Sequence, residues 1–148
     1  MNAEKFWLGW LKVTMIIVII GGAFLAIIPQ FINIPFLDNQ LYKEFFLAGV
    51  PEGVPAFTRW ITGVTGAVMF SWGLSMLYIV NHSFRQHEKW AWRSVFYPVL
   101  AWYIIDSAIS AHFGIGFNVV INSILFLQIM APLLFLRNYF FEQVSVLS

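Results

Sequence analysis

Four long apolar segments most constrain the fold of this chain, because each is long enough to cross a lipid bilayer as a helix. They lie at about residues 11–29, 60–81, 95–113 and 117–136. A helix needs about 20 residues to cross the hydrocarbon core. Of the 148 residues, 60% are hydrophobic and 10% are charged, whereas about one quarter of a soluble domain is charged. The sequence therefore predicts one all-α transmembrane domain over residues 1–148, with four spans.

The connections between these segments predict an integral membrane antiparallel four-helix bundle, which we expect to be left-handed. The Gly-Ile-Gly turn at residues 114–116 is short, so the third and fourth spans must be adjacent and antiparallel. The connection over residues 30–58 is the longest. We expect it to hold a short interfacial helix, with Asp38 as its N-cap and Gly49 as its C-terminal stop. This first extracytoplasmic loop is expected to cover part of the bundle.

The second segment carries a small residue at every fourth position, at Gly63, Ala67, Ser71 and Ser75. Rows of small side chains let helix backbones approach closely in a membrane. We expect this row to pack against another helix of the same chain. At the end of the first segment, Pro29 is expected to end or kink the helix.

The cations predict the orientation of the chain. If both termini are cytoplasmic, six cations lie on the cytoplasmic side: Lys5, Lys12, Arg85, Lys89, Arg93 and Arg137. The outer side then holds the other two, Lys43 and Arg59. This bias follows the positive-inside rule, which places basic connections in the cytoplasm. The sequence therefore predicts a multi-pass protein of the cytoplasmic membrane with both termini in the cytoplasm.

Partners are predicted at this basic face. Arg85, Lys89 and Arg93 lie near two tryptophans, a mixture that favours contact with the bilayer and with anionic lipid headgroups. A homo-oligomer or a partner membrane subunit is left open. The formal net charge of +1 gives no reason to expect nucleic acid as a partner.

Asp106 is the most informative polar residue, because it lies near the middle of the third apolar segment. Ionisable groups at this depth are costly; they usually face a bundle interior and mark a function. Ser110 follows one helical turn later and shares the same face. Counting residues from the 114–116 turn puts Asn122 level with Ser110 and puts Asp106 about one turn deeper.

The predicted ligand-binding or proton site is one polar patch, made by Asp106, Ser110, Asn122, Tyr103 and Asn118. Asn118 is expected nearer the rim, where it would cap the fourth helix. With no cation expected at this depth, Asp106 should be protonated at neutral pH or lie beside water. Two interpretations stay open: a structural patch whose interhelical hydrogen bonds stabilise the bundle, and a functional site.

Catalytic, metal and cofactor sites are not predicted. The chain has no cysteine, which excludes disulfides, thiolate metal sites and cysteine nucleophiles. His112 is expected near the outer surface, whereas His82 and His87 belong to the inner loop, so the three histidines do not make a cofactor site by themselves. A single axial haem ligand is left open. Phosphate-binding loops, serine-histidine-acid triads and zincin motifs are also lacking.

A family resemblance covers the chain from Trp60 onward. It rests on three motifs: Trp102-x-x-x-Asp106-Ser107-x-x-Ser110, Asn118-x-x-x-Asn122 and Pro132-Leu133. These motifs resemble a group of small bacterial four-helix membrane proteins of unassigned function. The general build is similar to the DoxX-like set. The resemblance implies a bacterial inner-membrane protein and supplies no substrate and no functional residue.

Three functions are compatible with the sequence. The leading hypothesis is a non-enzymatic accessory or small-ligand-binding subunit with a buried polar patch around Asp106. The first alternative is a proton-coupled or small-solute transporter or channel, which requires a water-connected cavity at Asp106. The second is a membrane enzyme acting on a lipid or quinone, with Asp106 as general acid. Such an enzyme requires a second titratable group within hydrogen-bond reach of Asp106.

Overall fold

The computed structural model describes residues 3–32, 34–35 and 42–141. Its main elements are four long helices and one short 3₁₀ helix: α1 (Ala3–Phe31), α3 (Val54–His82), η1 (Phe84–Gln86), α4 (Lys89–His112) and α5 (Gly116–Phe141). The described residues contain no strand, so the all-α prediction is confirmed. All four long helices are long and apolar enough to cross a membrane.

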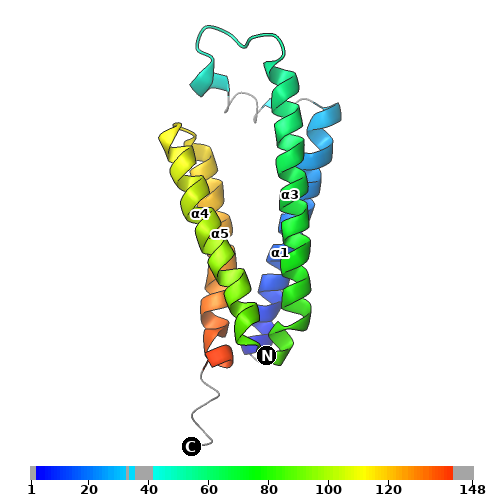
Figure 1. The fold of residues 1–148 in the computed structure, drawn as a ribbon, viewed down its shortest axis with the longest axis vertical. Coiled ribbons are helices and arrows are strands. Elements are labelled where there is room, and N and C mark those ends of the chain that lie inside the picture. The colour runs from blue at the N-terminus through cyan, green and yellow to red at the C-terminus, as the bar shows by residue number, and fades with distance from the viewer. Residues whose placement is uncertain (1–2, 33, 36–41, 142–148) are drawn as a thin grey trace, which may run out of the picture.

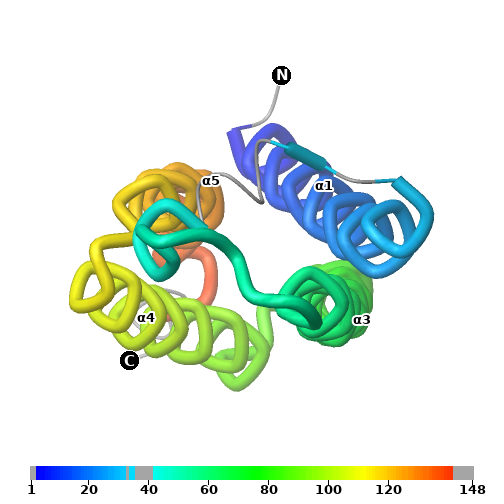
Figure 2. The backbone as a smooth tube through the Cα atoms, turned by 90° about the horizontal axis from the view of Figure 1, so that it is seen from above, coloured from blue at the N-terminus to red at the C-terminus, as the bar shows by residue number. Residues whose placement is uncertain are grey.

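The helices form two antiparallel pairs, α1 with α3 and α4 with α5. In Figure 1 the pairs lie close together at the end that holds the N-terminus and separate toward the other end. Viewed along the helices, α1, α3, α4 and α5 follow one another around a ring (Figure 2). The bundle is therefore closed at one end and splayed at the other.

The helices are longer than the predicted spans. α3 begins at Val54 rather than near residue 60, and α5 continues to Phe141 rather than ending near residue 136. Hydropathy locates the part of a helix that suits the hydrocarbon core, and the helical hydrogen bonds continue beyond it. α1 ends at Phe31, shortly after Pro29, as expected from the proline.

The hydrophobic core lies in the closed half of the bundle, where residues from all four helices meet. Its buried members are Leu11, Met15, Met76, Val80, Phe84, Ala91, Trp92, Val95, Val99, Ile129, Met130, Leu133, Leu136 and Phe140. The indole Nε1 of Trp92 donates a hydrogen bond to the Leu133 carbonyl oxygen at 2.8 Å. This bond fixes α4 against α5 inside the core.

A proline in α5 creates an attachment point for α1. Pro132 has no N–H, so the carbonyl of Gln128, four residues earlier, loses its helical partner. The indole Nε1 of Trp10 in α1 donates to this carbonyl oxygen at 3.2 Å. Close by, the ring of Trp7 stacks on Phe135 with centroids 4.3 Å apart. The two helix pairs are thus joined at their closed end by aromatic side chains.

α1 and α3 pack backbone against backbone through glycines. A Cβ atom placed on Gly22 would lie 2.8 Å from the carbonyl oxygen of Gly66. One placed on Gly66 would lie 2.7 Å from the carbonyl oxygen of Gly22 and closer still to the backbone nitrogen of Ala26. No side chain fits between the helices here, and van der Waals packing of this kind drives helix association in lipid.

The predicted packing row of α3 is right at Gly63, where an added Cβ would lie 3.6 Å from the Ala26 carbonyl oxygen of α1, and wrong at its other three positions. Ala67, Ser71 and Ser75 are exposed, and the α3 glycines that are buried are Gly66 and Gly73. The hydroxyls of Ser71 and Ser75 donate to backbone carbonyl oxygens one turn earlier, at 3.0 and 3.1 Å. The hydrogen-bonding needs of these serines are thus met within their own helix. Glycine allows the closest approach between helices, and the buried glycines lie on the contact face of α3.

The first loop lies against the turn between α4 and α5. Tyr42–Phe45 is helical, and the ring of Phe45 lies 5.9 Å from that of Phe113. Gly49 has a φ of 113°, but the helix ends at Phe45, four residues before this predicted stop, and a turn at residues 47–48 lies between them. The predicted N-cap, Asp38, lies outside the described residues.

The glycine contact predicts the effect of adding one methyl group. Gly66→Ala should destabilise the bundle by about 1–3 kcal/mol, the usual cost of overpacking a close contact. Gly9→Ala is the control, because a Cβ at Gly9 has nothing within 4 Å; it should be neutral or stabilising, since alanine is the better helix former. The measurement is the free energy of unfolding in detergent. Equal stability of the two variants would contradict the contact.

Candidate functional site

The candidate site lies between α4 and α5. Asp106 and Ser110 are one turn apart on α4, and Asn118 and Asn122 are one turn apart on α5. Residues four apart project from the same helix face. Because the helices are antiparallel neighbours, the two polar stripes face each other.

Three donors converge on one oxygen of Asp106. Its Oδ1 accepts hydrogen bonds from Ser110 Oγ at 3.1 Å, Asn118 Nδ2 at 2.8 Å and Asn122 Nδ2 at 3.0 Å. This oxygen is therefore the centre of the contact between α4 and α5.

The two asparagines use both of their amide N–H groups. Asn118 Nδ2 also donates to Ser110 Oγ at 2.8 Å, and Asn122 Nδ2 also donates to Ser107 Oγ at 3.4 Å. A side-chain amide has two N–H donors, so each amide is fully used as a donor within the network. Asn122 and Ser110 are only 4% and 8% exposed, which makes these bonds hard for water to replace.

The other oxygen of Asp106 has a different environment. The described residues provide no hydrogen-bond partner for Oδ2, and it is not among their buried unpartnered polar atoms. Asp106 lines a pocket of about 300 Å³ together with Trp102, Ile105 and Ile109. Since Oδ1 already accepts three bonds, Oδ2 is the atom that can carry a proton or meet a ligand.

An aromatic contact connects this pocket with α3. The ring of Trp102 lies 5.8 Å from that of Trp72 in α3. Trp102 precedes Asp106 by one turn, so its ring stands on the same face of α4 as the carboxyl group. The pocket thus combines one carboxylate oxygen, an indole and aliphatic side chains.

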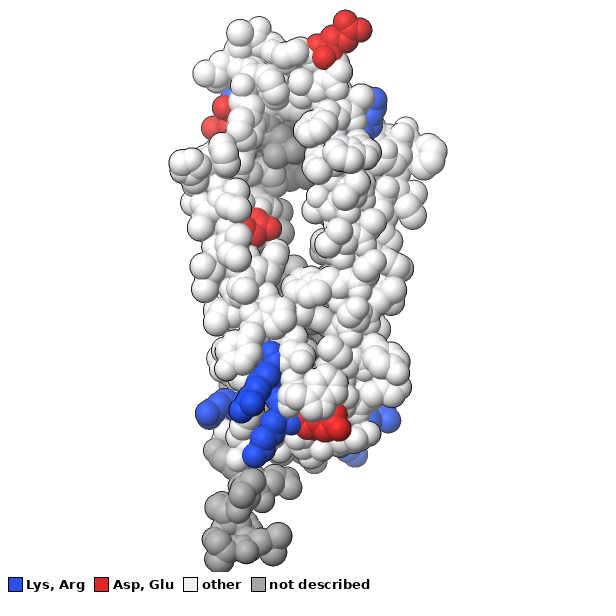
Figure 3. Space-filling view, viewed as in Figure 1, with Lys and Arg blue, Asp and Glu red and all other residues white. Residues whose placement is uncertain are grey.

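A second cavity of about 400 Å³ lies between the two helix pairs. Its walls come from α1, α3 and α5 and are formed by Thr14, Ile17, Val18, Gly21, Met69, Ile121, Ile124, Leu125 and Gln128. The space-filling view shows the molecule hollowed between its two halves (Figure 3). This cavity shares no lining residue with the pocket at Asp106.

The structure brings four of the five predicted site residues together: Asp106, Ser110, Asn118 and Asn122. Tyr103 lies outside this network. Its hydroxyl is hydrogen-bonded to Ser123 Oγ at 3.1 Å, and its ring stacks on Phe126 at 4.2 Å. Tyr103 therefore forms a separate polar contact between the same two helices.

The predicted role of Asn118 is wrong. It lies inside α5, which begins at Gly116, and its amide donates into the network instead of capping the helix. The predicted depths are also shifted: Asn122 bonds Asp106 and Ser107, and it is Asn118 that bonds Ser110. Counting from the turn assumes that both helices have ideal geometry and that their axes are aligned. A shift of a few residues lies within that approximation.

Sequence reasoning missed Ser107 and Trp102 as parts of the site. Ser107 directly follows Asp106, and Trp102 precedes it by one turn. Both stood in the motif on which the family resemblance rests, so the signal was present. What the motif could not supply was the direction of each side chain.

Metal binding has no support within the part of the chain that the structure describes, where no group of three histidine, cysteine or acidic residues could hold an ion. His82 Nδ1 lies 2.9 Å from the Tyr78 carbonyl oxygen. His87 Nε2 lies 2.7 Å from Glu4 Oε1 and joins η1 to α1. Both histidines thus make contacts near the closed end of the bundle.

These features define an all-α protein with four candidate membrane-spanning helices and a polar network centred on one carboxylate. Comparisons with protein-family models, with curated proteins and with solved structures found no match to this chain. The function must therefore be inferred from the chemistry of the site.

The network predicts a measurable contribution from Asn122. Asn122→Ala removes two donors and should destabilise the bundle by about 1 kcal/mol, since interhelical hydrogen bonds in membranes average about 0.6 kcal/mol each. Asn138→Ala is the matched control, because Asn138 is exposed on the same helix. Unfolding titrations in mixed micelles give both values. If Asn138→Ala were as destabilised as Asn122→Ala, the network would have no specific contribution to stability.

Proposed function

We propose that this chain is a non-enzymatic integral membrane protein that binds a small ligand at Asp106. The observation that carries the proposal is that the two carboxyl oxygens of Asp106 have different environments. Oδ1 is used by three internal donors, and the residue lines a pocket that Oδ2 can reach. The internal donors thus leave Oδ2 as the oxygen open to a ligand.

The pocket chemistry favours a ligand with an ammonium or another N–H donor. A carboxylate oxygen accepts such a donor in a charge-assisted hydrogen bond, and the face of an indole attracts a cation. Trp102 supplies the indole, while Ile105 and Ile109 offer apolar contact. The volume of about 300 Å³ is at the lower limit of small-molecule pockets. The ligand is therefore a small amphipathic amine.

Two alternatives receive less support. The hydrogen-bond partners of Asp106 in the described structure are serine and asparagine side chains, whereas acid-base catalysis on a lipid or quinone would need a second titratable group. A transporter would need one continuous cavity, but the space between the helix pairs and the Asp106 pocket have separate linings. Binding requires neither feature.

The proposal places the protein in a bacterial cytoplasmic membrane with both termini inside. On the face drawn in Figure 3, most basic side chains gather at the closed end of the bundle. Basic residues concentrate on the cytoplasmic side of membrane proteins. In this orientation the Asp106 pocket lies nearer the outer leaflet, and the protein acts as a binding subunit beside a membrane partner or a second copy of itself. The likeness to the DoxX-like set rests on the general build alone and remains a prediction.

Asp106→Asn separates ligand binding from folding. The asparagine keeps an acceptor oxygen for the three internal donors but loses the charge at the pocket. We expect near-normal stability and at least about tenfold weaker binding of hexylammonium, because a charge-assisted bond contributes about 1.5–3 kcal/mol. Binding is measured by calorimetry in detergent.

Glu52→Gln is the control for this experiment, because it removes one carboxylate from an exposed loop. It should bind hexylammonium as the unmodified chain does. Undiminished binding by Asp106→Asn would contradict the proposed site. Loss of folding in that variant would show that Asp106 has a structural role alone.

The orientation has its own test, made simple by the absence of cysteine. Single cysteines are introduced at two exposed positions, Glu52→Cys in the first loop and Gln86→Cys at η1. In intact cells a membrane-impermeant maleimide should label only Glu52→Cys. Both should react after the membrane is permeabilised. Labelling of Gln86→Cys in intact cells would reverse the topology.

A further inference from the structure

We propose that the closed end of the bundle holds one anionic diacyl phospholipid, with an acyl chain in a groove between α4 and α5 and its phosphate at three cations. This site is separate from Asp106 and does not depend on the ligand proposed there. The occupant is identified by an apolar groove that continues directly into a cluster of positive charge.

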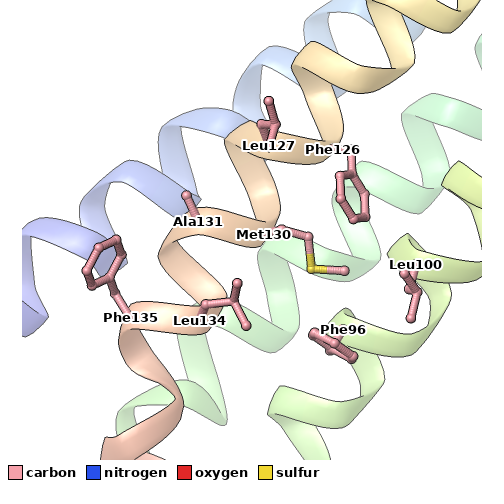
Figure 4. Close-up of a pocket in the computed structure, with 8 residues that line it drawn as sticks. All are labelled: Phe96, Leu100, Phe126, Leu127, Met130, Ala131, Leu134 and Phe135. Atoms are coloured by element: carbon pink, nitrogen blue, oxygen red, sulfur yellow. The ribbon is translucent and has the colours of Figure 1, made fainter.

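The groove has a volume of about 570 Å³, and its lining is apolar: Phe96, Leu100, Phe126, Leu127, Met130, Ala131, Leu134 and Phe135. In Figure 4 the two α4 side chains, Phe96 and Leu100, face those of Phe126, Met130 and Leu134 on α5. On α5 the lining extends from residue 126 to 135, about 14 Å at 1.5 Å per residue. A groove of this length and composition suits part of an acyl chain.

Three cations meet around one ring next to the groove. Lys89 Nζ lies 5.9 Å from the centroid of the Phe141 ring, and the guanidinium carbons of Arg93 and Arg137 each lie 5.7 Å from it. All three side chains are exposed. Ion pairs in the described part of the chain join Lys43 to Glu44 and His87 to Glu4, and neither uses this cluster. The cluster can therefore accept an anion from outside.

The groove and the cluster lie on the same helix faces. On α4, Arg93 is three residues before Phe96 and seven before Leu100. On α5, Arg137 is three residues after Leu134 and seven after Met130. Residues at these spacings share a face. A chain lying in the groove thus leads one turn further to the arginines.

The bilayer explains why a phospholipid is the occupant. A phosphate is joined to its acyl chains at the boundary between polar and apolar layers, which is where the groove meets the cations. Two of the three cations predicted to contact headgroups, Lys89 and Arg93, lie at the Phe141 ring, and our proposal takes Arg137 as the third. Arg85 belongs to η1 and serves below as a control position.

The test measures lipid that stays bound in detergent micelles, where no charged membrane surface contributes. The protein is mixed with phosphatidylglycerol or with phosphatidylcholine and examined by native mass spectrometry. We expect one phosphatidylglycerol per chain and little phosphatidylcholine. Arg93→Gln combined with Arg137→Gln should weaken phosphatidylglycerol retention about thirtyfold, at about fivefold per cation.

Two matched controls separate the site from general effects. Lys5→Gln combined with Arg85→Gln also removes two cations and should change retention less than twofold. Leu134→Trp should fill the groove and reduce retention about tenfold, whereas Ile104→Trp, at an exposed α4 position outside the groove, should not. Thermal melting of each variant confirms that it is folded.

Several results would overturn the proposal. Equal losses in the two double variants would show that net charge alone matters. Retention unchanged in Leu134→Trp would remove the acyl chain from the groove. Full displacement of the lipid by millimolar inorganic phosphate would identify a phosphate site without a lipid, and equal retention of phosphatidylcholine would exclude charge recognition.

Discussion

The contact between α4 and α5 depends on how one carboxyl group is accommodated among apolar helices. A carboxyl oxygen among apolar side chains is stabilised when it finds hydrogen-bond partners. Asp106 finds them on its own helix and on α5, through Ser110, Asn118 and Asn122. Because Asp106 and Ser110 on α4, and Asn118 and Asn122 on α5, are each one helical turn apart, the network fixes both the facing surfaces and the relative register of α4 and α5.

The other helix pair, α1 and α3, packs closely through glycines. Gly22 and Gly66 remove side chains so that the backbones of α1 and α3 touch. Close backbone packing therefore holds α1 against α3, whereas directional hydrogen bonds hold α4 against α5. The pairs are joined mainly at the closed end, by the shared core and by Trp10 at the carbonyl that Pro132 leaves free. The cavities in the splayed half follow from this one-sided connection.

The sequence was sufficient for the helices and for the composition of the polar patch. Apolar length determines the spans, and spacing by four residues places Asp106 with Ser110 and Asn118 with Asn122 on common faces. It was not sufficient for the packing face of α3, because glycine and serine are both small and only coordinates show that Ser71 and Ser75 bond to their own backbone. It also could not place Tyr103, whose ring is turned toward Phe126 by stacking.

A structural role for Asp106 between the helices is compatible with the binding role proposed for it. A carboxyl group has two oxygens, and the fold uses one of them for three internal bonds. Those bonds fix the orientation of the group, so its second oxygen is held in place before any ligand arrives. Preorganisation of this kind lowers the cost of binding. Among the described residues Asp106 has no cationic partner, and the network is then the reason why it can present a defined acceptor to the pocket beside Trp102.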